Sequence, residues 1–387
     1  MKNAIQHYEW GSKTAMAELF ELPNPDDKPM AEIWMGAHPK ASSEIVVEGE
    51  HLSLEDFIER YKGQALGELE YQRYEKLPYL FKVLSASKSL SIQVHPSKHQ
   101  AEVGFARENS EGVSLGAPER QYQDSNHKPE IIYALTKFKG MNGFRPYGEV
   151  MELLVDLESS ALDVPLQQYA KACDAQGLRE LFKTVLSFEG EKKRALIAAV
   201  SEWAGRTPNA LGEVVSALLE QYPGDIGAVA PFMLNVVELN PGEAMFIDAG
   251  TPHAYLGGTG LEVMASSDNV LRAGLTPKHI DIDELMACSK FTELNSHELL
   301  IKPVQTSEEL LFPVPVSDFR FSVLDSPSGD TFELNSAEIW FAIDKDATLT
   351  DSRGQELRIS KGQSVFIPAM ASKVHVMSQG RIARVKS

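Results

Sequence analysis

Three short segments of the sequence carry side chains that could bind one metal ion. Residues 91–96 (SIQVHP) place Gln93 and His95 two positions apart, so both side chains point to one face if the segment is a strand. Residues 126–130 (NHKPE) add the carboxylate of Glu130, and residues 251–255 (TPHAY) add His253. The three segments together supply two imidazoles, one carboxylate and one amide oxygen.

This set of donors suits a borderline divalent ion, and zinc is the first candidate. A closed structural zinc site would more usually use thiolates, but Cys173 and Cys288 are the only cysteines and show no CxxC spacing. A neutral amide ligand leaves the metal a strong Lewis acid, which favours catalysis. A single histidine in an apolar strand is also commonly a hydrogen-bonded structural residue, so the prediction requires the three segments to meet.

Composition limits the classes of protein that need to be considered. A chain of 387 residues exceeds one hydrophobic core and should form two or three domains. No apolar run could span a bilayer, the first ten residues lack the apolar core of a secretion signal, and two cysteines suit a reducing compartment. We therefore expect a cytoplasmic protein that associates with no membrane.

The net charge of -18 argues against nucleic acid as a partner, because phosphate backbones require a basic surface. It does not exclude a small anionic ligand, provided that cations gather locally. Four basic residues flank the three segments and are candidates for this role: Lys82, Lys128, Arg272 and Lys278.

The sequence pattern changes twice along the chain. Residues 30–145 contain mostly short strand-like runs, apart from a polar stretch over 98–126 that is typical of a helix followed by a long loop. Apolar residues recur at helical spacing over 150–223, and strand-like sequence resumes at 232–239. The pattern predicts a helical block inserted into a β domain.

An internal repeat indicates the type of β domain. Residues 241–249 (PGEAMFIDA) resemble residues 361–369 (KGQSVFIPA) at an offset of 120, although a chance match between two hairpins is the alternative. A glycine turn, a short apolar strand and a bend with a histidine are typical of the cupin jelly roll. At this offset His253 corresponds to Lys373, so we expect only the first copy to bind metal. The predicted fold is mainly β with an α-helical insertion: two cupin-type jelly rolls, or double-stranded β-helices, plus a helical domain.

Four motifs in order, SIQVHP, NHKPE, GTPHAY and DNVLRAGLTPKH, resemble the type I phosphomannose isomerases. The resemblance begins at residues 8–11 (YEWG) and 31–36 (AEIWMG) and extends to Lys278. It implies a monomeric two-cupin enzyme with a helical insertion that interconverts mannose 6-phosphate and fructose 6-phosphate, with this phosphosugar as its partner. It also implies one zinc ion per chain, held by Gln93, His95, Glu130 and His253.

The aldose–ketose reaction that the resemblance implies proceeds through a cis-enediol and needs a base and a group that stabilises an oxyanion. Lys128, two residues before Glu130, is our candidate base, whereas His127 would point the other way. Arg272 stays protonated and could hold the enediolate or the phosphate. Glu262 is a second carboxylate that could exchange protons during ring opening.

The family pattern also brings Ser91, Lys82 and Lys278 near the phosphate and makes Trp10 a wall of the sugar pocket. It divides the chain into residues 1–148 and 226–305 for the metal-binding cupin, 149–225 for the helical insertion, and 306–387 for a C-terminal cupin-like lobe without metal. Part of residues 12–48 is expected to complete this last lobe.

Two other functions remain open on the sequence. A metal-dependent cupin dioxygenase would hold ferrous iron with two histidines and a carboxylate, and Gln93 argues against it. A non-catalytic sugar-binding or regulatory cupin would keep the fold and need neither Lys128 nor Arg272.

Overall fold

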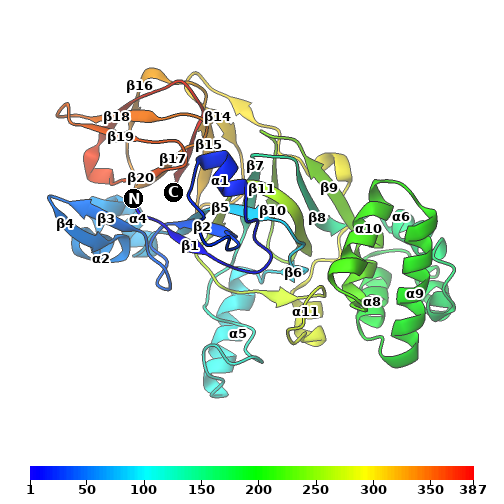
Figure 1. Ribbon diagram of the computed structural model, residues 1–387. Helices are drawn as coiled ribbons and strands as arrows, with labels where there is room; N and C mark the ends of the chain where they lie inside the picture. The colour runs from blue at the N-terminus through cyan, green and yellow to red at the C-terminus, as the bar shows by residue number, and fades with distance from the viewer.

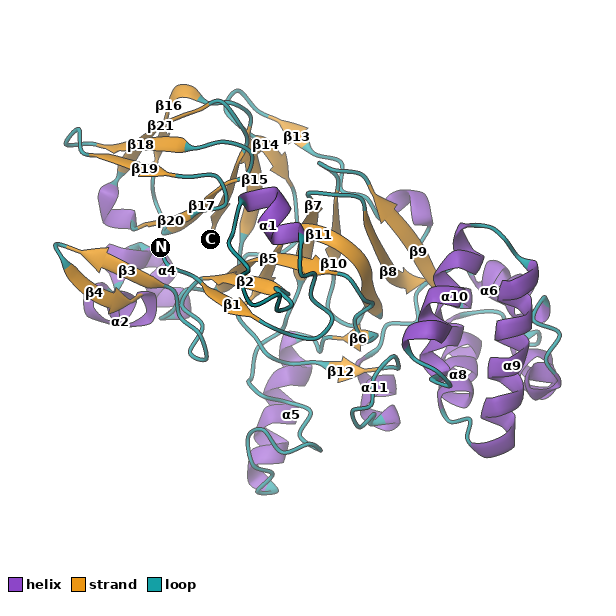
Figure 2. Cartoon of the chain, in the orientation of Figure 1, coloured by secondary structure: helices purple, strands orange, loops and turns teal.

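The computed structural model describes residues 1–387, which form two β lobes and a block of helices (Figures 1 and 2). The first lobe is built from two sheets that share β11 (His253–Ala265). The larger sheet has the order β1-β2-β5-β11-β7-β10, formed by β1 (Ala4–Gln6), β2 (Glu32–Met35), β5 (Tyr79–Ala86), β7 (Glu130–Ala134) and β10 (Ala244–Ile247). The other sheet joins the start of β11 to β6 (Gln93–Val94), β12 (Leu271–Arg272), β8 (Phe138–Phe144) and β9 (Leu234–Leu239).

A glycine lets β11 pass from one sheet to the other. The register of β11 against β8 shifts between Tyr255 and Gly257. Gly258 then has a φ of +115°, and a Cβ at this position would lie 2.5 Å from the Lys137 carbonyl oxygen. A larger residue would therefore be strained and crowded here. The bend brings His253, at the start of the strand, and Glu262, near its end, to one barrel interior.

The C-terminal lobe repeats this architecture. One sheet has the order β13-β14-β15-β22-β17-β20, from β13 (Val304–Gln305), β14 (Leu310–Phe312), β15 (Arg320–Leu324), β22 (Ile382–Lys386), β17 (Glu338–Ala342) and β20 (Ser364–Ile367). The other has the order β16-β21-β18-β19, from β16 (Ser328–Glu333), β21 (Lys373–Ser378), β18 (Ala347–Asp351) and β19 (Glu356–Ile359). The predicted fold of two jelly rolls with a helical insertion is confirmed.

The offset of 120 residues also holds at the level of single strands. β10 and β20 cover corresponding residues, and Lys373 opens β21 as His253 opens β11. Glu130 lies opposite Ile247 in the first lobe, and Glu338 lies opposite Ile367 in the second. Glu338 is therefore the counterpart of Glu130, and its carboxylate is already bound by a cation. Arg384 donates from Nε to Oε2 at 2.6 Å and from Nη2 to Oε1 at 2.7 Å.

The predicted helical block begins at α6 (Tyr147–Val155) and continues as η1 (Ser160–Leu162), α7 (Asp163–Tyr169), α8 (Ala175–Leu186), α9 (Gly190–Arg206), α10 (Ala210–Gln221) and η2 (Ile226–Phe232). The apolar residues at helical spacing, such as Leu181 and Phe182 in α8 and Val200 in α9, are buried. Their core continues into the first lobe through Phe144, whose ring packs 5.2 Å from that of Phe182.

The remaining elements cover the lobes and the ends of the sheets. They are α1 (Ala15–Phe20), the hairpin β3 (Glu44–Val47) and β4 (Glu50–Ser53), α2 (Leu54–Tyr61), α3 (Gly63–Leu66), α4 (Glu68–Tyr74), α5 (Lys98–Ser110), α11 (Ile282–Cys288), η3 (Ser296–Glu298) and η4 (Ala369–Ala371). None of the helices combines the length and the apolar character needed to cross a bilayer.

Residues 12–48 contact the C-terminal lobe through side-chain packing. They add no strand to either of its sheets, because β2 pairs within the first lobe and β3 pairs with β4. Phe20 in α1 instead packs edge-on against Phe341 of β17, with ring centroids 5.3 Å apart. The expected contribution of this segment to the lobe is thus packing and not strand addition.

We predict that Arg384→Met destabilises the protein strongly. Both side chains of the Arg384–Glu338 pair are less than 5% exposed, so the variant leaves a buried carboxylate without its bidentate cation. The cost should be about 3–5 kcal/mol in the free energy of unfolding, measured by urea denaturation. Arg381→Met, which breaks a more exposed pair with Asp344, should cost less than about 1 kcal/mol. Equal stability of the two variants would contradict the assigned role of Arg384.

Candidate metal centre and adjoining cleft

Glu130, His95 and His253 meet inside the barrel of the first lobe. One ligand atom from each lies within 4.8 Å of the other two, and all three side chains are buried. His95 Nε2 is 3.4 Å from Glu130 Oε1, and His253 Nε2 is 3.5 Å from Glu130 Oε2. The two imidazoles therefore present the same ring nitrogen to the two oxygens of one carboxylate.

Backbone carbonyls fix the orientation of both rings. The Asn269 carbonyl accepts a hydrogen bond from His95 Nδ1 at 2.7 Å, and the Thr251 carbonyl accepts one from His253 Nδ1 at 2.9 Å. These contacts leave each Nε2 as a lone-pair donor, which is the tautomer that a metal ligand needs. Burial and the nearby Lys128 lower the pKa of His95 to about 4, so its imidazole is neutral at physiological pH.

Gln93 completes the predicted set. It pairs directly with His253 across β6 and β11, and it lines the same small cavity as Glu130 and His253. The strand is shorter than the sequence suggested, because β6 ends at Val94 and His95 follows it, immediately before Pro96. Proline cannot donate to a neighbouring strand, so the pairing stops here. The structure nevertheless brings all four predicted ligands to the same region.

The residues present fit a divalent metal ion. His95 Nε2 is buried and has no hydrogen-bond partner, which would be costly if nothing bound it. The cavity of about 50 Å³ beside it is lined by two lysines, Lys82 and Lys128, and three carboxylates, Glu32, Glu130 and Glu262. With all five groups charged, the cavity carries a net charge of -1, and a bound dication changes it to +1. A net positive charge stabilises an oxyanion that develops during a reaction.

Lys128 and Lys82 each face a carboxylate in this cavity. Lys128 Nζ lies 2.7 Å from Glu130 Oε1, so the predicted base is next to the predicted ligand. Lys82 Nζ lies 2.8 Å from Glu262 Oε2 and 3.7 Å from Glu32 Oε1. Burial disfavours the charged amine of Lys82, but these two carboxylates outweigh it and raise its pKa, so Lys82 stays protonated. Burial raises the pKa of Glu262 against the opposing effect of Lys82.

The small cavity opens into a cleft of about 580 Å³, and Glu32, Lys82 and Gln93 line both. The other predicted substrate residues line this cleft as well: Trp10, Ser91, Arg272 and Lys278. Arg272 donates from Nη1 to Ser91 Oγ at 2.6 Å, which joins two of them directly.

Three cations that line the cleft lack a carboxylate partner: Arg272, Lys278 and Lys88. None of the three forms an ion pair, although the chain has 18 more acidic than basic residues. Repulsion from Arg272, and then burial, lower the pKa of Lys278. Cations that gather in a polar cleft without acidic partners are typical of an anion-binding site.

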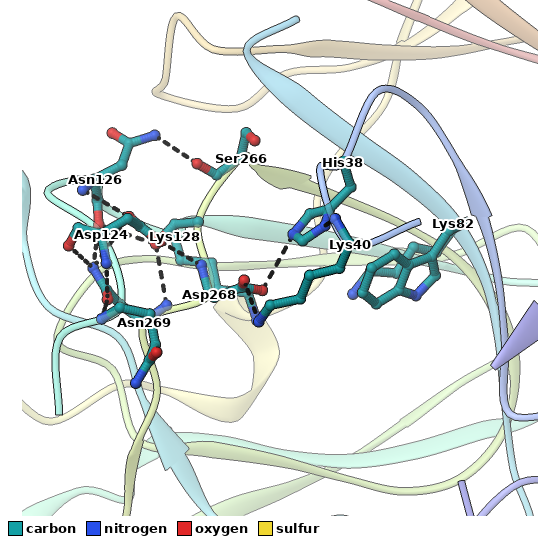
Figure 3. A network of polar contacts seen from close by, with 12 residues as sticks. His38, Lys40, Lys82, Asp124, Asn126, Lys128, Ser266, Asp268 and Asn269 are labelled. Atoms are coloured by element: carbon teal, nitrogen blue, oxygen red, sulfur yellow. Dashed lines mark hydrogen bonds and ion pairs between the residues drawn. The ribbon is translucent and has the colours of Figure 1, made fainter. Parts of the chain in front are cut away.

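Figure 3 shows a polar network around Asn269 and Asp268 that the sequence did not reveal. The buried Asn269 accepts from Gln123 N at 2.7 Å and donates to the Asp124 and Asn126 carbonyls at 2.8 Å each. Its own carbonyl is the partner of His95. Asn269 thus connects a predicted metal ligand with the loop that leads to Lys128.

The next residue, Asp268, extends the network to the cleft. Its carboxylate lies 3.3 Å from His38 Nε2 and 2.8 Å from Lys40 Nζ (Figure 3). Burial opposes ionisation of Asp268, but His38 and Lys40 prevail and hold its pKa well below the usual value. Asp268 and Lys40 both line the cleft.

Asp268, Asn269 and Glu32 were not among the site residues that we predicted from the sequence. Asp268 and Asn269 lie in the DNVLRAGLTPKH motif and Glu32 lies in AEIWMG, so the motifs themselves were the available signal. Their partners are distant in the chain, and no local spacing relates them. His127, in contrast, points away from the centre as predicted, with Nε2 3.1 Å from Asp318 Oδ1.

Comparisons with known proteins agree with this arrangement. Residues 1–147 match the family description "Phosphomannose isomerase type I, catalytic domain", residues 154–234 match "Phosphomannose isomerase type I, helical insertion domain", and residues 308–387 match "Mannose-6-phosphate isomerase, cupin domain".

Full-length relatives are also similar. The mannose-6-phosphate isomerase of Escherichia coli K12 is 48% identical over 99% of this chain and 98% of its own length. A crystal structure of a mutant phosphomannose isomerase from Salmonella typhimurium has a TM-score of 0.96 at 46% identity and covers 100% of this chain and 98% of that one. A zinc-bound mannose 6-phosphate isomerase structure has a TM-score of 0.95 at 46% identity, with the same coverage.

The fold and the histidine–carboxylate centre place the chain among the two-domain cupins that carry a helical insertion. Its similarity over almost the whole length is specific enough to define the family. The chain belongs to the type I phosphomannose isomerases.

We predict that Glu130→Gln weakens binding of divalent zinc by at least about 100-fold, because it removes the only carboxylate between the two imidazoles. Competition with a chelating dye measures the affinity. Glu262→Gln is the matched control, since this carboxylate lies in the same cavity but pairs with Lys82, and it should keep its affinity for zinc. Equal zinc affinities for the two variants would exclude Glu130 as a ligand.

We also predict that Asn269→Ala weakens zinc binding, by about tenfold, although Asn269 itself is no ligand. Loss of the side-chain contacts frees the turn whose carbonyl orients His95. The same dye competition applies, with a thermal melt to establish that the variant is folded at the temperature of the measurement. A folded variant with unchanged zinc affinity would show that the turn needs no such anchor.

Proposed function

We propose that the chain interconverts mannose 6-phosphate and fructose 6-phosphate through a cis-enediol intermediate. The observation that carries the proposal is the position of the histidine–carboxylate centre beside a cleft whose lining includes cations without a carboxylate partner. A sugar phosphate combines an anionic group with reactive carbons, and the cleft offers cations for the first beside a metal centre for the second. Family membership supports the same reaction.

Gln93, His95, Glu130 and His253 are the proposed zinc ligands, with one ion per chain. Zinc bound there would supply Lewis acidity and a positive charge that stabilises an oxyanion developing on the sugar. The four residues come from β6, the loop after it, β7 and β11, so the barrel itself sets their positions.

Lys128 is the proposed base. Its amine takes the proton from C2 of open-chain mannose 6-phosphate, the hydroxyl proton passes from O2 to O1 within the enediolate, and the amine returns its proton to C1. The cis geometry of the intermediate allows both transfers at carbon to occur on one face of the sugar. Burial of Lys128, with 10% of its side chain exposed, limits exchange of that proton with water. Lys82 remains protonated and stabilises negative charge on the intermediate, and Glu262, bound to Lys82, is placed to exchange a proton during ring opening.

Ser91 and Lys278 are proposed to bind the phosphate, and Arg272 is proposed to hold the phosphate or the enediolate. Lys82 lines both the cleft and the small cavity, so it lies between the two groups. The guanidinium of Arg272 and the hydroxyl of Ser91 already lie together, so they can contact one phosphate group. Trp10 stacks on Tyr8 at the side of the cleft, with ring centroids 5.7 Å apart, and forms a wall for the sugar.

We further propose that the enzyme acts as a monomer in the cytoplasm. Every residue assigned above comes from a single chain, so the site needs no second copy. Cys173 and Cys288 are both free thiols, which suits a reducing compartment.

We predict that Lys128→Met lowers kcat for mannose 6-phosphate isomerisation by at least about 1000-fold, because proton transfer loses its base. The variant should still bind one zinc ion, measured by metal analysis after dialysis. Lys137→Met, which removes a surface lysine that pairs with Glu238, should keep wild-type turnover. Turnover by the Lys128 variant at more than a tenth of the wild-type rate would exclude Lys128 as the base. A wild-type protein that binds zinc and sugar without turnover would instead support a binding module.

A further inference from the structure

The loop between Arg272, at the end of β12, and Lys278 has an unfavourable backbone conformation. Leu275 lies between Arg272 and Lys278 and has a φ of +55°, in the left-handed region that branched side chains rarely adopt. Gly274 before it has a φ of +125°, and a Cβ there would lie 2.7 Å from the Gly227 Cα. Such a conformation persists only where the surrounding structure holds it.

One carboxylate at the end of the helical insertion holds this loop. Asp225 Oδ1 accepts from Leu275 N at 2.9 Å, and Asp225 Oδ2 accepts from Thr276 N at 3.2 Å. Oδ1 also accepts from Gly227 N at 2.7 Å, so Asp225 caps η2 at the same time. The side chain therefore fixes this loop to the helical block through two consecutive backbone amides.

The same part of the insertion holds the loop that leads to Ser91. Gln221 Oε1 accepts from Ser89 N at 2.8 Å, and the Tyr222 hydroxyl donates to the Ser89 carbonyl at 2.5 Å. Gln221 and Tyr222 also line the cleft. Residues 221–227 thus contact both loops that bear the proposed phosphate-binding groups, which come from parts of the chain about 180 positions apart.

We propose that Asp225 is a positioning residue for phosphate binding, and that the helical insertion serves to hold the two phosphate loops in register. This proposal rests on the proposed function. Asp225 does not contact the phosphate. It acts by keeping Leu275 in its unusual conformation, so that the loop brings Lys278 into the cleft near Arg272, which β12 holds against β6. The reaction centre is fixed separately by the barrel strands and does not depend on Asp225.

The test compares steady-state kinetics of Asp225→Ala and Asp225→Asn with those of the wild type. KM for mannose 6-phosphate should rise by about tenfold in D225A, with kcat within about twofold of wild type, because substrate binding is affected and the chemical step is not. The inhibition constant of inorganic phosphate should rise in parallel. D225N keeps one acceptor oxygen but brings an amide group against a backbone N–H. Its KM and its inhibition constant for phosphate should therefore lie between those of the wild type and of D225A. Zinc content should be unchanged.

Asp174→Ala is the matched control. Asp174 caps α8 in the same insertion by accepting from Gln176 N and Gly177 N, each at 3.0 Å, and it does not line the cleft. The Asp174→Ala variant should have a lower melting temperature than the wild type, with unchanged KM and phosphate inhibition constant. If D225A fails to fold, D225N decides the question by the same two constants.

The proposal is overturned if folded Asp225 variants keep the wild-type KM and phosphate inhibition, if they lose kcat at constant KM, or if D174A raises KM equally. An inactive wild-type protein would instead reject the proposed function. The two failures are therefore distinguishable.

Discussion

A carboxylate buried inside a β barrel must be compensated by positive charge. The two lobes of this protein differ in the groups that supply that charge. In the C-terminal lobe the guanidinium of Arg384 binds both oxygens of Glu338. In the first lobe the corresponding carboxylate, Glu130, faces two imidazoles and one lysine. Burial opposes the charge on Glu130, but Lys128 and His95 prevail and hold its pKa well below the usual value. The first lobe thereby leaves room for a metal ion beside Glu130, whereas in the second lobe the side chain of Arg384 binds the corresponding carboxylate.

The sequence predicted the parts of the site that depend on strand geometry. The proposed ligands fall at or next to the ends of strands, and the 120-residue offset aligns β10 with β20 and His253 with Lys373, because the same hairpin geometry occurs in both lobes. The helical insertion was also predictable, since its buried residues recur at helical spacing. The strand at Gln93 was overestimated in length, because a proline two residues after Val94 ends its pairing.

What the sequence did not predict are contacts between distant segments. Asn269 binds a loop about 145 positions earlier, and Asp225 binds one about 50 positions later. Neither contact produces a periodic pattern, and a capping aspartate has the same local appearance whether it holds only its own helix or a second loop as well. The sequence also did not predict that Lys82 is buried, because a lysine between Phe81 and Val83 in a strand is compatible with a side chain that faces solvent. In the structure Glu32 and Glu262 pair with it.

The central claim is that a zinc ion held in the first barrel is required for isomerisation of mannose 6-phosphate. The most direct measurement is turnover of the purified protein before chelation, after removal of metal, and after zinc is added back. We expect activity to disappear on chelation and to return with one equivalent of zinc per chain. Full activity in a protein shown to contain no metal would contradict the account.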